Sequence, residues 1–319
     1  MIDVLFIALG LALLYFGGET LIRGAMAAAR RLGVSPLLSG LVILGFGTSS
    51  PELAVSVDAA ISQRPDIAVG NVVGSNIGNI LLILGLCAMI SPMNVRPMML
   101  RRDGVIALTA ALFFVVLAAT GGLLGRLDAS ILLAALVAYL FLGWWTERTG
   151  APSAELHRAE ADELQAVPDS AFRTFAAIIA GLALLIGGSQ ALLKGAVGLA
   201  EHFGMSEALI GLTIVAIGTS LPELTVSLIA ALRRHADVAI GNILGSNIFN
   251  VLGILGVAAL VQPLSVNARI LDFDQWMMVG ATVALLVFLY TGKRLSRVEG
   301  ALLLAGYIGY LAVSFLALG

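Results

Sequence analysis

Long apolar stretches separated by short polar segments dominate the sequence from end to end. A helix needs roughly 20 predominantly apolar residues to cross a lipid bilayer, and stretches of that length recur along the whole chain. The pattern predicts ten membrane-spanning helices, at residues 3–22, 36–61, 67–90, 104–121, 128–146, 174–197, 207–232, 238–260, 273–291 and 299–317. The predicted fold class is therefore an all-α integral membrane protein.

The composition agrees with this interpretation. Hydrophobic residues make up 59% of the chain and charged residues 12%, whereas soluble domains are about half apolar and about a quarter charged. The first apolar stretch, residues 2–16, has no basic residue before it and no small-residue cleavage site after it, so we interpret it as a span and not as a cleaved signal. The single cysteine, Cys87, has no partner for a disulfide and lacks the neighbours of a metal site; we interpret it as a packing residue.

The second half of the chain repeats the first. Residues 40–86 align with residues 211–257 at a constant offset of 171 residues without a gap, and 26 of the 47 aligned pairs are identical. Segments that contain polar identities include Gly47-Thr48-Ser49 with Gly218-Thr219-Ser220, Pro51-Glu52-Leu53 with Pro222-Glu223-Leu224, Ser56 with Ser227, Gly70-Asn71 with Gly241-Asn242, Gly74-Ser75-Asn76-Ile77 with Gly245-Ser246-Asn247-Ile248, and Asn79 with Asn250. Self-similarity of this kind at a fixed offset indicates two copies of one structural unit.

Each half contains five predicted spans, an odd number, so the two halves are expected to enter the membrane from opposite sides as inverted-topology repeats. If the N-terminus lies outside, 14 of the 18 Lys and Arg residues fall in cytoplasmic loops, as the positive-inside rule requires. We therefore expect a multi-pass protein of the cell (inner) membrane with both termini outside. The domains are then a first five-helix repeat at 1–148, a cytoplasmic linker at 149–172 and a second five-helix repeat at 173–319.

The linker region is the one clearly aqueous segment, and it is rich in acidic residues. It lacks the alternating acids around a glycine that a calcium-sensing loop needs. We therefore interpret it as a solvated connection between the repeats.

Each repeat carries a proline followed by a glutamate near the middle of its second span. Pro51 and Pro222 have no amide hydrogen and would clash with the carbonyl four residues earlier, so each helix is expected to break or kink there. Glu52 and Glu223 follow directly, at a depth where a charge costs on the order of 3 kcal/mol even on lenient insertion scales. Two such carboxylates at equivalent positions have no packing rationale and predict a bound cation.

Further oxygen-bearing side chains share helix faces with these glutamates or with each other, because residues three or four apart lie on one face. Hydroxyls lie one turn before and one turn after each glutamate, at Thr48, Ser56, Thr219 and Ser227. A serine and an asparagine share a face in the third and the eighth span, Ser75 with Asn79 and Ser246 with Asn250. Such all-oxygen sets suit calcium or sodium and argue against zinc or copper.

Other residues have a structural interpretation. Serines in helices commonly bond back to helix carbonyls, which leaves the roles of Ser56 and Ser227 open. Glycines four apart are typical of close helix packing; these are Gly70, Gly74, Gly241 and Gly245. Four asparagines are interpreted as ties between helices, Asn71, Asn76, Asn242 and Asn247. Asp66 and Asp237 are expected to cap helix N-termini, and the unrepeated acids Glu19 and Asp58 to lie at the periphery.

The segments GTSSPEL…GNVVGSNIGN and GTSLPEL…GNILGSNIFN resemble the paired alpha-repeats of the calcium/cation antiporter superfamily, in its prokaryotic sodium/calcium exchanger branch. The resemblance covers the whole chain and implies ion ligation by the side chains of Thr48, Ser49, Glu52, Ser75, Asn79, Thr219, Ser220, Glu223, Ser246 and Asn250 and by backbone carbonyls near Gly45 and Ala216. Some members of the superfamily carry an acid at the position of Asn250, and the linker is too short for the regulatory calcium-binding domains of animal exchangers.

The resemblance implies a secondary antiporter that exchanges calcium for sodium at one midplane site by alternating access, with the first and sixth spans sliding across a rigid core. A calcium/proton exchanger of the same fold and a cation channel are the alternatives. An intramembrane enzyme is not expected, because all three histidines lie in loops and no nucleophile–base pair is visible. The expected partners are the lipid bilayer and the transported ions; no cofactor is expected, and no basic run predicts a nucleic acid partner.

Overall fold

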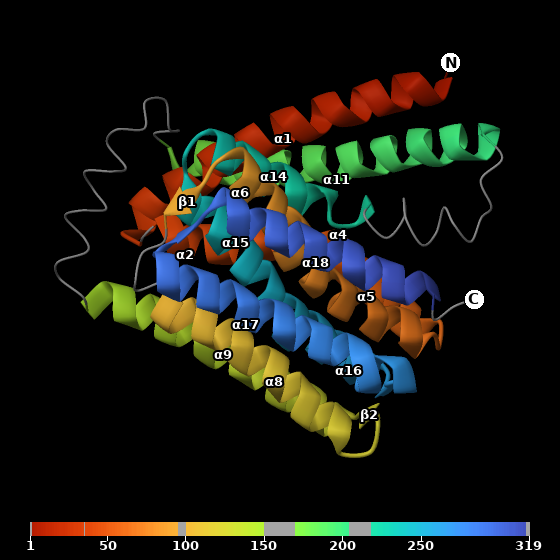
Figure 1. The fold of residues 1–319 in the computed structure, drawn as a ribbon. Coiled ribbons are helices and arrows are strands. Elements are labelled where there is room, and N and C mark those ends of the chain that lie inside the picture. The colour runs from red at the N-terminus through yellow and green to blue at the C-terminus, as the bar shows by residue number, and fades with distance from the viewer. Residues whose placement is uncertain (1, 35, 95–99, 150–169, 204–217, 317–319) are drawn as a thin grey trace.

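The computed structural model describes residues 2–34, 36–94, 100–149, 170–203 and 218–316, and these residues are helical almost throughout (Figure 1). In the labels, η marks a π-helical segment. The elements of the first half are α1 (Ile2–Leu32), α2 (Pro36–Ser39), η1 (Gly40–Leu44), α3 (Gly45–Thr48), α4 (Ser50–Ile61), α5 (Pro65–Gly78), η2 (Asn79–Leu84), α6 (Gly85–Ile90), β1 (Met93–Asn94), η3 (Leu100–Gly104), α8 (Val105–Ala119), β2 (Leu123–Leu124) and α9 (Arg126–Thr149). Those of the second half are α11 (Ala171–His202), α14 (Leu221–Leu232), α15 (Ala236–Phe249), η5 (Asn250–Ile254), α16 (Leu255–Val261), β3 (Leu264–Ser265), η6 (Ile270–Asp274), α17 (Gln275–Gly292), β4 (Arg294–Leu295) and α18 (Arg297–Leu316).

Seven of the described helices are long and apolar enough to cross a membrane, and the bent pair Gly40–Thr48 and Ser50–Ile61 makes an eighth if it counts as one span. Of the predicted seventh span, residues 207–217 lie outside the described residues, and α14 covers most of the remainder. α1 and α11 are 31 and 32 residues long, longer than predicted. An arginine ends an apolar stretch but does not end a helix, because arginine is a good helix former.

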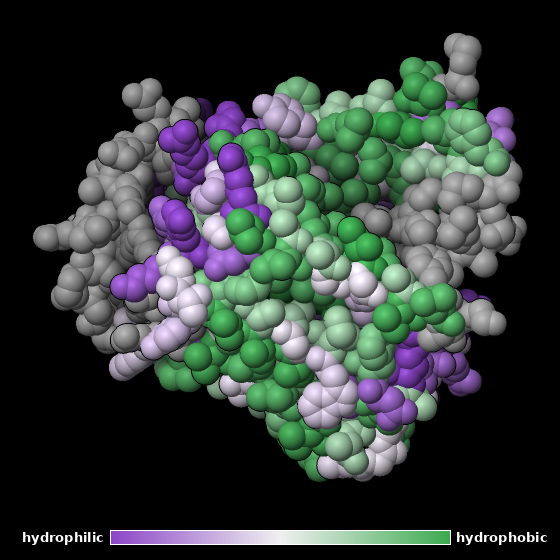
Figure 2. All heavy atoms as spheres, viewed as in Figure 1, coloured by the Kyte–Doolittle hydropathy of each residue, from purple (hydrophilic) through white to green (hydrophobic). Residues whose placement is uncertain are grey.

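Apolar side chains cover the outer surface as well as fill the core, and many of the polar side chains are buried. Large apolar side chains are exposed on the outer helices, for example Val116 on α8 and Phe141 on α9, and Figure 2 shows apolar residues over much of the visible face. Polar side chains are instead buried in the interior, among them the two repeated glutamates. This arrangement suits a protein whose outer surface contacts lipid.

The predicted break in the second span is confirmed. The helix axis turns by 48° between residues 40–48 and 50–61, and Ser49 between them has a non-helical conformation (φ −80°, ψ 10°). Pro51 is the second residue of α4, where its missing amide hydrogen leaves no bond unmade. In the second half Ser220 has nearly the same conformation (φ −87°, ψ 10°) and directly precedes α14. Each proline therefore begins a new helix and does not kink a continuous one.

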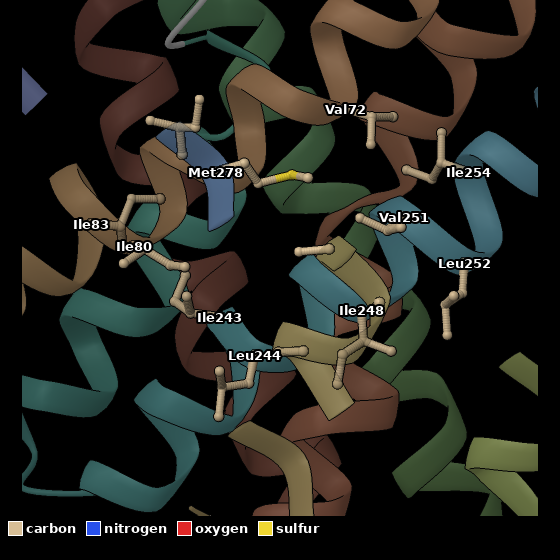
Figure 3. Packing of buried hydrophobic residues seen from close by; sticks show 14 of the residues in the cluster. Val72, Ile80, Ile83, Ile243, Leu244, Ile248, Val251, Leu252, Ile254 and Met278 are labelled. Atoms are coloured by element: carbon tan, nitrogen blue, oxygen red, sulfur yellow. The ribbon is translucent and has the colours of Figure 1, made fainter. Parts of the chain in front are cut away.

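Two long helical rods cross at the centre of the molecule, α5–η2–α6 and α15–η5–α16. Within the most apolar 18-residue stretch of each rod, 61% of the residues of the first and 83% of those of the second are buried, compared with 22% for α11. Ile80 and Ile83 of the first rod and Ile248 and Val251 of the second belong to the packed cluster in Figure 3. The π-helical segments of the two rods begin at Asn79 and Asn250, and such segments are frequent at functional sites.

α1 and α11 lie side by side along one edge of the bundle (Figure 1). Glycines seven residues apart line both helices at their interface: Gly10, Gly17 and Gly24 on α1, and Gly181, Gly188 and Gly195 on α11. A Cβ atom at Gly17 would lie 2.8 Å from the Leu185 amide nitrogen, and one at Gly188 would lie 2.8 Å from the Leu14 amide nitrogen. Backbone therefore contacts backbone, and the two helices form one tightly packed pair.

Two short antiparallel sheets join the halves. β1 pairs with β4, Met93 opposite Leu295, and β2 pairs with β3, Leu124 opposite Leu264. At the repeat offset of 171 residues, β1 corresponds to β3 and β2 corresponds to β4. Each sheet is therefore the repeat equivalent of the other. This reciprocal pairing is what a two-fold relation between the halves produces, and it extends the repeat well beyond the region where the sequence shows it.

Candidate ion-binding site

The two repeated glutamates are buried at the centre of the bundle. Glu52 and Glu223 are each the third residue of a helix, α4 and α14, that begins at a break in the chain. The amide groups of a first helical turn favour a nearby negative charge. Both carboxylates therefore lie where the backbone partly compensates their charge.

Each carboxylate accepts a hydrogen bond from a serine of the other repeat. These two residues, Ser49 and Ser220, stand at the helix breaks directly before α4 and α14, and we call them the break serines. Ser220 Oγ donates to Glu52 Oε1 at 3.1 Å, and Ser49 Oγ donates to Glu223 Oε1 at 2.8 Å. The halves thus exchange one pair of bonds across the pseudo-two-fold relation. One centre results, built equally from both repeats.

The second oxygen of each carboxylate has no partner. Glu52 Oε2 and Glu223 Oε2 are buried without a hydrogen bond, and so are the amide oxygens Asn79 Oδ1 and Asn250 Oδ1. Among the described residues only one other buried side-chain oxygen or nitrogen shares this condition, Gln275 Oε1. Leaving buried polar groups unsatisfied is costly. These four unpaired acceptors stand at equivalent repeat positions and are candidate ligands for a cation.

Further hydroxyl groups and one backbone carbonyl lie close to Glu223. Ser246 Oγ donates to the Gly45 carbonyl at 3.1 Å and approaches Glu223 Oε1 at 3.5 Å. The Gly45 backbone approaches the second rod closely, since an added Cβ would lie 2.8 Å from the Ser246 amide nitrogen. Thr48 Oγ1 is buried and donates to the Leu44 carbonyl at 2.9 Å.

The site has two dissimilar flanks. A small pocket opens on the first, which we call the Gly78 flank; its lining residues are Gly74, Ser75, Gly78, Leu82, Ile83, Ser220, Leu224 and Tyr307. On the opposite flank, which we call the Phe249 flank, the repeat equivalent of Gly78 is Phe249. Its ring stacks on Phe46 with centroids 4.3 Å apart. A Cβ at Gly253 would lie 2.6 Å from the Phe249 ring, so the aromatic side chain fills the space there.

The chemistry of the site is that of hard oxygen ligands. The described residues contain no group of three or more His, Cys, Asp and Glu side chains that could hold a metal ion. Two carboxylates supplemented by neutral amide and hydroxyl oxygens suit calcium or sodium, which accept such ligands.

Comparison with known proteins decides the family. The family model described as sodium/calcium exchanger protein matches residues 2–145 and 173–316. The chain is 42% identical over 314 residues to the putative antiporter CaxA of Alkalimonas amylolytica, covering 97% of this chain and 98% of the relative. It is 34% identical over 345 residues to the sodium/calcium exchanger MaX1 of Methanosarcina acetivorans, covering 98% of this chain and 99% of the relative.

The chain belongs to the sodium/calcium exchanger family. The solved structure of the sodium-calcium exchanger NCX_Mj resembles it with a TM-score of 0.82 and 32% sequence identity over 98% of each chain. The resemblance drawn from the repeated motifs is thereby confirmed. A member of this family is a membrane antiporter of cations and not a catalyst.

Most of the residues that the resemblance implied as exchanger ligands lie together. Hydrogen bonds connect the two glutamates with Ser49, Ser220, Ser246 and the Gly45 carbonyl. Asn79 and Asn250 are buried on the two central rods with their amide oxygens unpaired. Ser75 shares the pocket of the Gly78 flank with Ser220. Thr219 is half-buried beside Ser220, and Ala216 lies outside the described residues.

The structure also decides the roles of Ser56 and Ser227, which the sequence left open, and it corrects the expected position of Glu19. Asn71 Nδ2 donates to Ser56 Oγ at 2.9 Å, and Asn242 Nδ2 donates to Ser227 Oγ at 2.9 Å, so these two serines connect neighbouring helices. Glu19 is not peripheral as expected. It is buried on α1, and its carboxylate lies 2.5 Å from Arg233 Nη2. Its carboxylate also pairs with Arg23, one turn later on α1. Sequence reasoning missed the burial of Glu19 because no acid stands at its repeat equivalent and Arg233 is distant in sequence.

Proposed function

We propose that the chain exchanges calcium for sodium across the cell (inner) membrane by alternating access at the site centred on Glu52 and Glu223. The observation that carries the proposal is the set of four buried oxygens without a protein partner, two from carboxylates and two from amides. The names of MaX1 and NCX_Mj describe sodium/calcium exchangers, and the similarity of this chain to both supports the same pair of ions.

The charge of the site fits calcium and sodium in alternation. Asparagine at positions 79 and 250 leaves Glu52 and Glu223 as the two formal charges of the donor set. One calcium ion balances them. Several sodium ions can replace it where hydroxyl and amide oxygens complete their coordination shells, which leaves the loaded site modestly positive.

A calcium/proton exchanger is the rival within the same fold. It would need a carboxylate in this site that takes up and releases a proton during each cycle. The serine hydroxyls that donate to Glu52 and Glu223 leave the second oxygen of each carboxylate without a partner, beside two unpaired amide oxygens. A metal cation binds several such oxygens at once, whereas a proton binds one, so this set of unpaired oxygens favours metal cations as the exchanged ions.

The proposal is tested by calcium uptake into vesicles that contain the purified protein, under sodium, potassium or proton gradients of equal size. A sodium gradient should drive uptake, and the other two should not. Uptake driven by a proton gradient and indifferent to sodium would establish the rival. Calcium flux without any counter-ion would instead indicate a channel.

We further propose ten spans arranged as two inverted repeats, 1–148 and 173–319, with both termini outside and the linker 149–172 in the cytoplasm. The reciprocal sheets and the reciprocal serine–glutamate bonds support two-fold-related halves. Linker residues 150–169 lie outside the described residues. Single cysteines at Ser153 and Gly319, in a background lacking Cys87, should react with an impermeant reagent from opposite sides. Reaction from one side would contradict the inversion.

The proposed motion is a joint sliding of α1 and α11 across the rest of the bundle. Their backbone-to-backbone packing supports movement as one unit. Polar contacts between this pair and the rest of the bundle include the ion pair of Glu19 on α1 with Arg233 at the end of α14. Ser39 Oγ of α2 donates to the Ala25 carbonyl of α1 at 2.6 Å, and Ser189 Oγ of α11 donates to the Gly218 carbonyl at 2.6 Å.

A further inference from the structure

Two buried asparagines outside the predicted ligand set, Asn76 and Asn247, link the central rods to each other. They are 2% and 5% exposed. Asn76 Nδ2 donates to the Asn247 carbonyl at 3.1 Å, and Asn247 Nδ2 donates to the Asn76 carbonyl at 3.2 Å. The expected tie between helices is therefore present, and it is reciprocal.

These bonds fix which way both side-chain amides face. A backbone carbonyl only accepts hydrogen bonds, so the NH₂ group of Asn76 or Asn247 must point toward it. The Oδ1 atom of each side chain is then directed elsewhere. Each Oδ1 accepts a hydrogen bond from an asparagine of the predicted ligand set in the other repeat.

The bonds to the ligand asparagines cross between the repeats. Asn250 Nδ2 donates to Asn76 Oδ1 at 2.9 Å, and Asn79 Nδ2 donates to Asn247 Oδ1 at 2.9 Å. With its nitrogen engaged, each ligand amide turns its oxygen the other way. Asn79 Oδ1 and Asn250 Oδ1 are the atoms that remain buried without a partner.

We infer that Asn76 and Asn247 are positioning residues that aim the amide oxygens of Asn250 and Asn79 at the transported cation. A flipped ligand amide would present its NH₂ group, whose partial positive charge repels a cation. The flip is prevented because it would place two oxygens against each other at Asn76 Oδ1 or Asn247 Oδ1. This inference rests on the proposed function.

The test is a double-mutant cycle read as the KM for calcium in sodium-driven uptake. Removal of such an outer partner of a ligand typically weakens metal affinity about 10- to 100-fold, so Asn76→Leu should raise the KM by about that factor. In an Asn250→Ala background, the same substitution should have no further effect, because the amide that Asn76 aims is absent. In an Asn79→Ala background the effect should persist, since Asn247 aims Asn79.

A merely structural role predicts another outcome, namely that Asn76→Leu raises the KM equally in all three backgrounds. That result, or an unchanged KM in the otherwise native chain, overturns the inference. Asn247→Leu provides an independent test: its effect on the KM should disappear in the Asn79→Ala background and persist in the Asn250→Ala background. Asn76→Ser and Asn247→Ser, which disturb packing less, replace the leucine variants if these do not fold.

A second measurement separates this inference from the proposed function. Equilibrium binding of radioactive calcium to the purified protein is measured for the same variants, without any gradient. If the native chain binds calcium but shows no sodium-driven uptake, the proposed counter-ion fails while the binding cycle still decides the role of Asn76 and Asn247. If Asn76→Leu weakens calcium binding equally with and without Asn250→Ala, the positioning role is wrong even though the proposed function can still hold.

Discussion

The two flanks of the ion site carry nearly the same ligands but different surroundings. On the Gly78 flank, Ser75 and Ser220 line a pocket, and position 78 contributes no side chain. On the Phe249 flank, the equivalent Ser246 and Ser49 are fully buried, and the Phe249 ring stacks on Phe46. Repetition has therefore preserved the oxygen atoms that we propose to hold the ion, while the residues beside them have diverged.

This difference shows how a symmetric site serves an asymmetric task. An alternating-access transporter must present one set of ligands to two sides in turn. In the proposed mechanism, equal ligands from both repeats would bind the ion in the same way in both states, whereas unequal flanks would make the two routes to it independently adjustable. Four predictions test this comparison, from the largest expected effect to the smallest.

The largest effect on calcium uptake is expected at the two glutamates, which are the same in both repeats. Glu52→Gln and Glu223→Gln each remove half of the negative charge that balances a calcium ion. Breaking one buried charge interaction typically costs about 3–5 kcal/mol, which corresponds to a loss of calcium affinity of more than about a hundredfold. Both variants should abolish sodium-driven calcium uptake while remaining inserted. Asp58→Asn, which neutralises an exposed acid of the same helix α4 outside the site, is the control and should retain uptake.

The next effect should appear where the flanks differ. Gly78→Phe gives the Gly78 flank the side chain of its counterpart, which should fill the pocket and strongly slow calcium uptake. Overpacking of this kind also costs about 1–3 kcal/mol of stability. Gly78→Ala is the control, since its Cβ would meet no described atom closer than the Tyr307 ring at 4.0 Å. Undiminished uptake by Gly78→Phe would show that ions do not use this flank.

A smaller and graded effect is expected at the break serines. Ser49→Ala and Ser220→Ala each remove one hydrogen bond to a carboxylate, worth about 1.5–3 kcal/mol when the acceptor is charged. Ser49 is fully buried and Ser220 is half-buried beside the pocket, where water can replace the lost hydroxyl. The KM for calcium should therefore rise more in Ser49→Ala. An equal rise in both variants would contradict the difference in access.

The smallest effects should come from the ties of the sliding pair. Arg233 is 47% exposed in its pair with Glu19, and such exposed pairs contribute about 0–1 kcal/mol. Ser189→Ala removes a buried bond to the Gly218 carbonyl, worth about 1 kcal/mol. Thermal unfolding in detergent should show a lower Tm for Ser189→Ala than for Arg233→Ala. The reverse order would indicate that the ion pair holds α1 more firmly than its exposure suggests.

Much of the site could be predicted from the sequence because the repeat marks its own functional residues. Identity at a constant offset of 171 residues selected the glutamates, the break serines and the ligand asparagines. The broken helix followed from Pro51, since proline cannot sit in a continuous helix interior without loss of a bond. These features depend on local chemistry, which a sequence pattern carries.

Other features had no local signal. The burial of Glu19 depends on Arg233, which lies more than two hundred residues later. The glycines of α1 and α11 resemble those of any helix until the two backbones are seen in contact. The interpretation of Asn76 and Asn247 as ties was correct but incomplete, because their bonds to the ligand amides cross between repeats.

The sequence by itself determined the helical membrane class and the family, and it selected the residues that we propose to hold the cation, because apolar length, proline and carboxylate chemistry are properties of the local sequence. Only the tertiary structure decided the direction in which each amide oxygen points, the closure of one flank by Phe249 and the opening of the other at Gly78. Those properties belong to pairs of residues brought together across the two repeats, and their energies arise only when the rods have packed against each other.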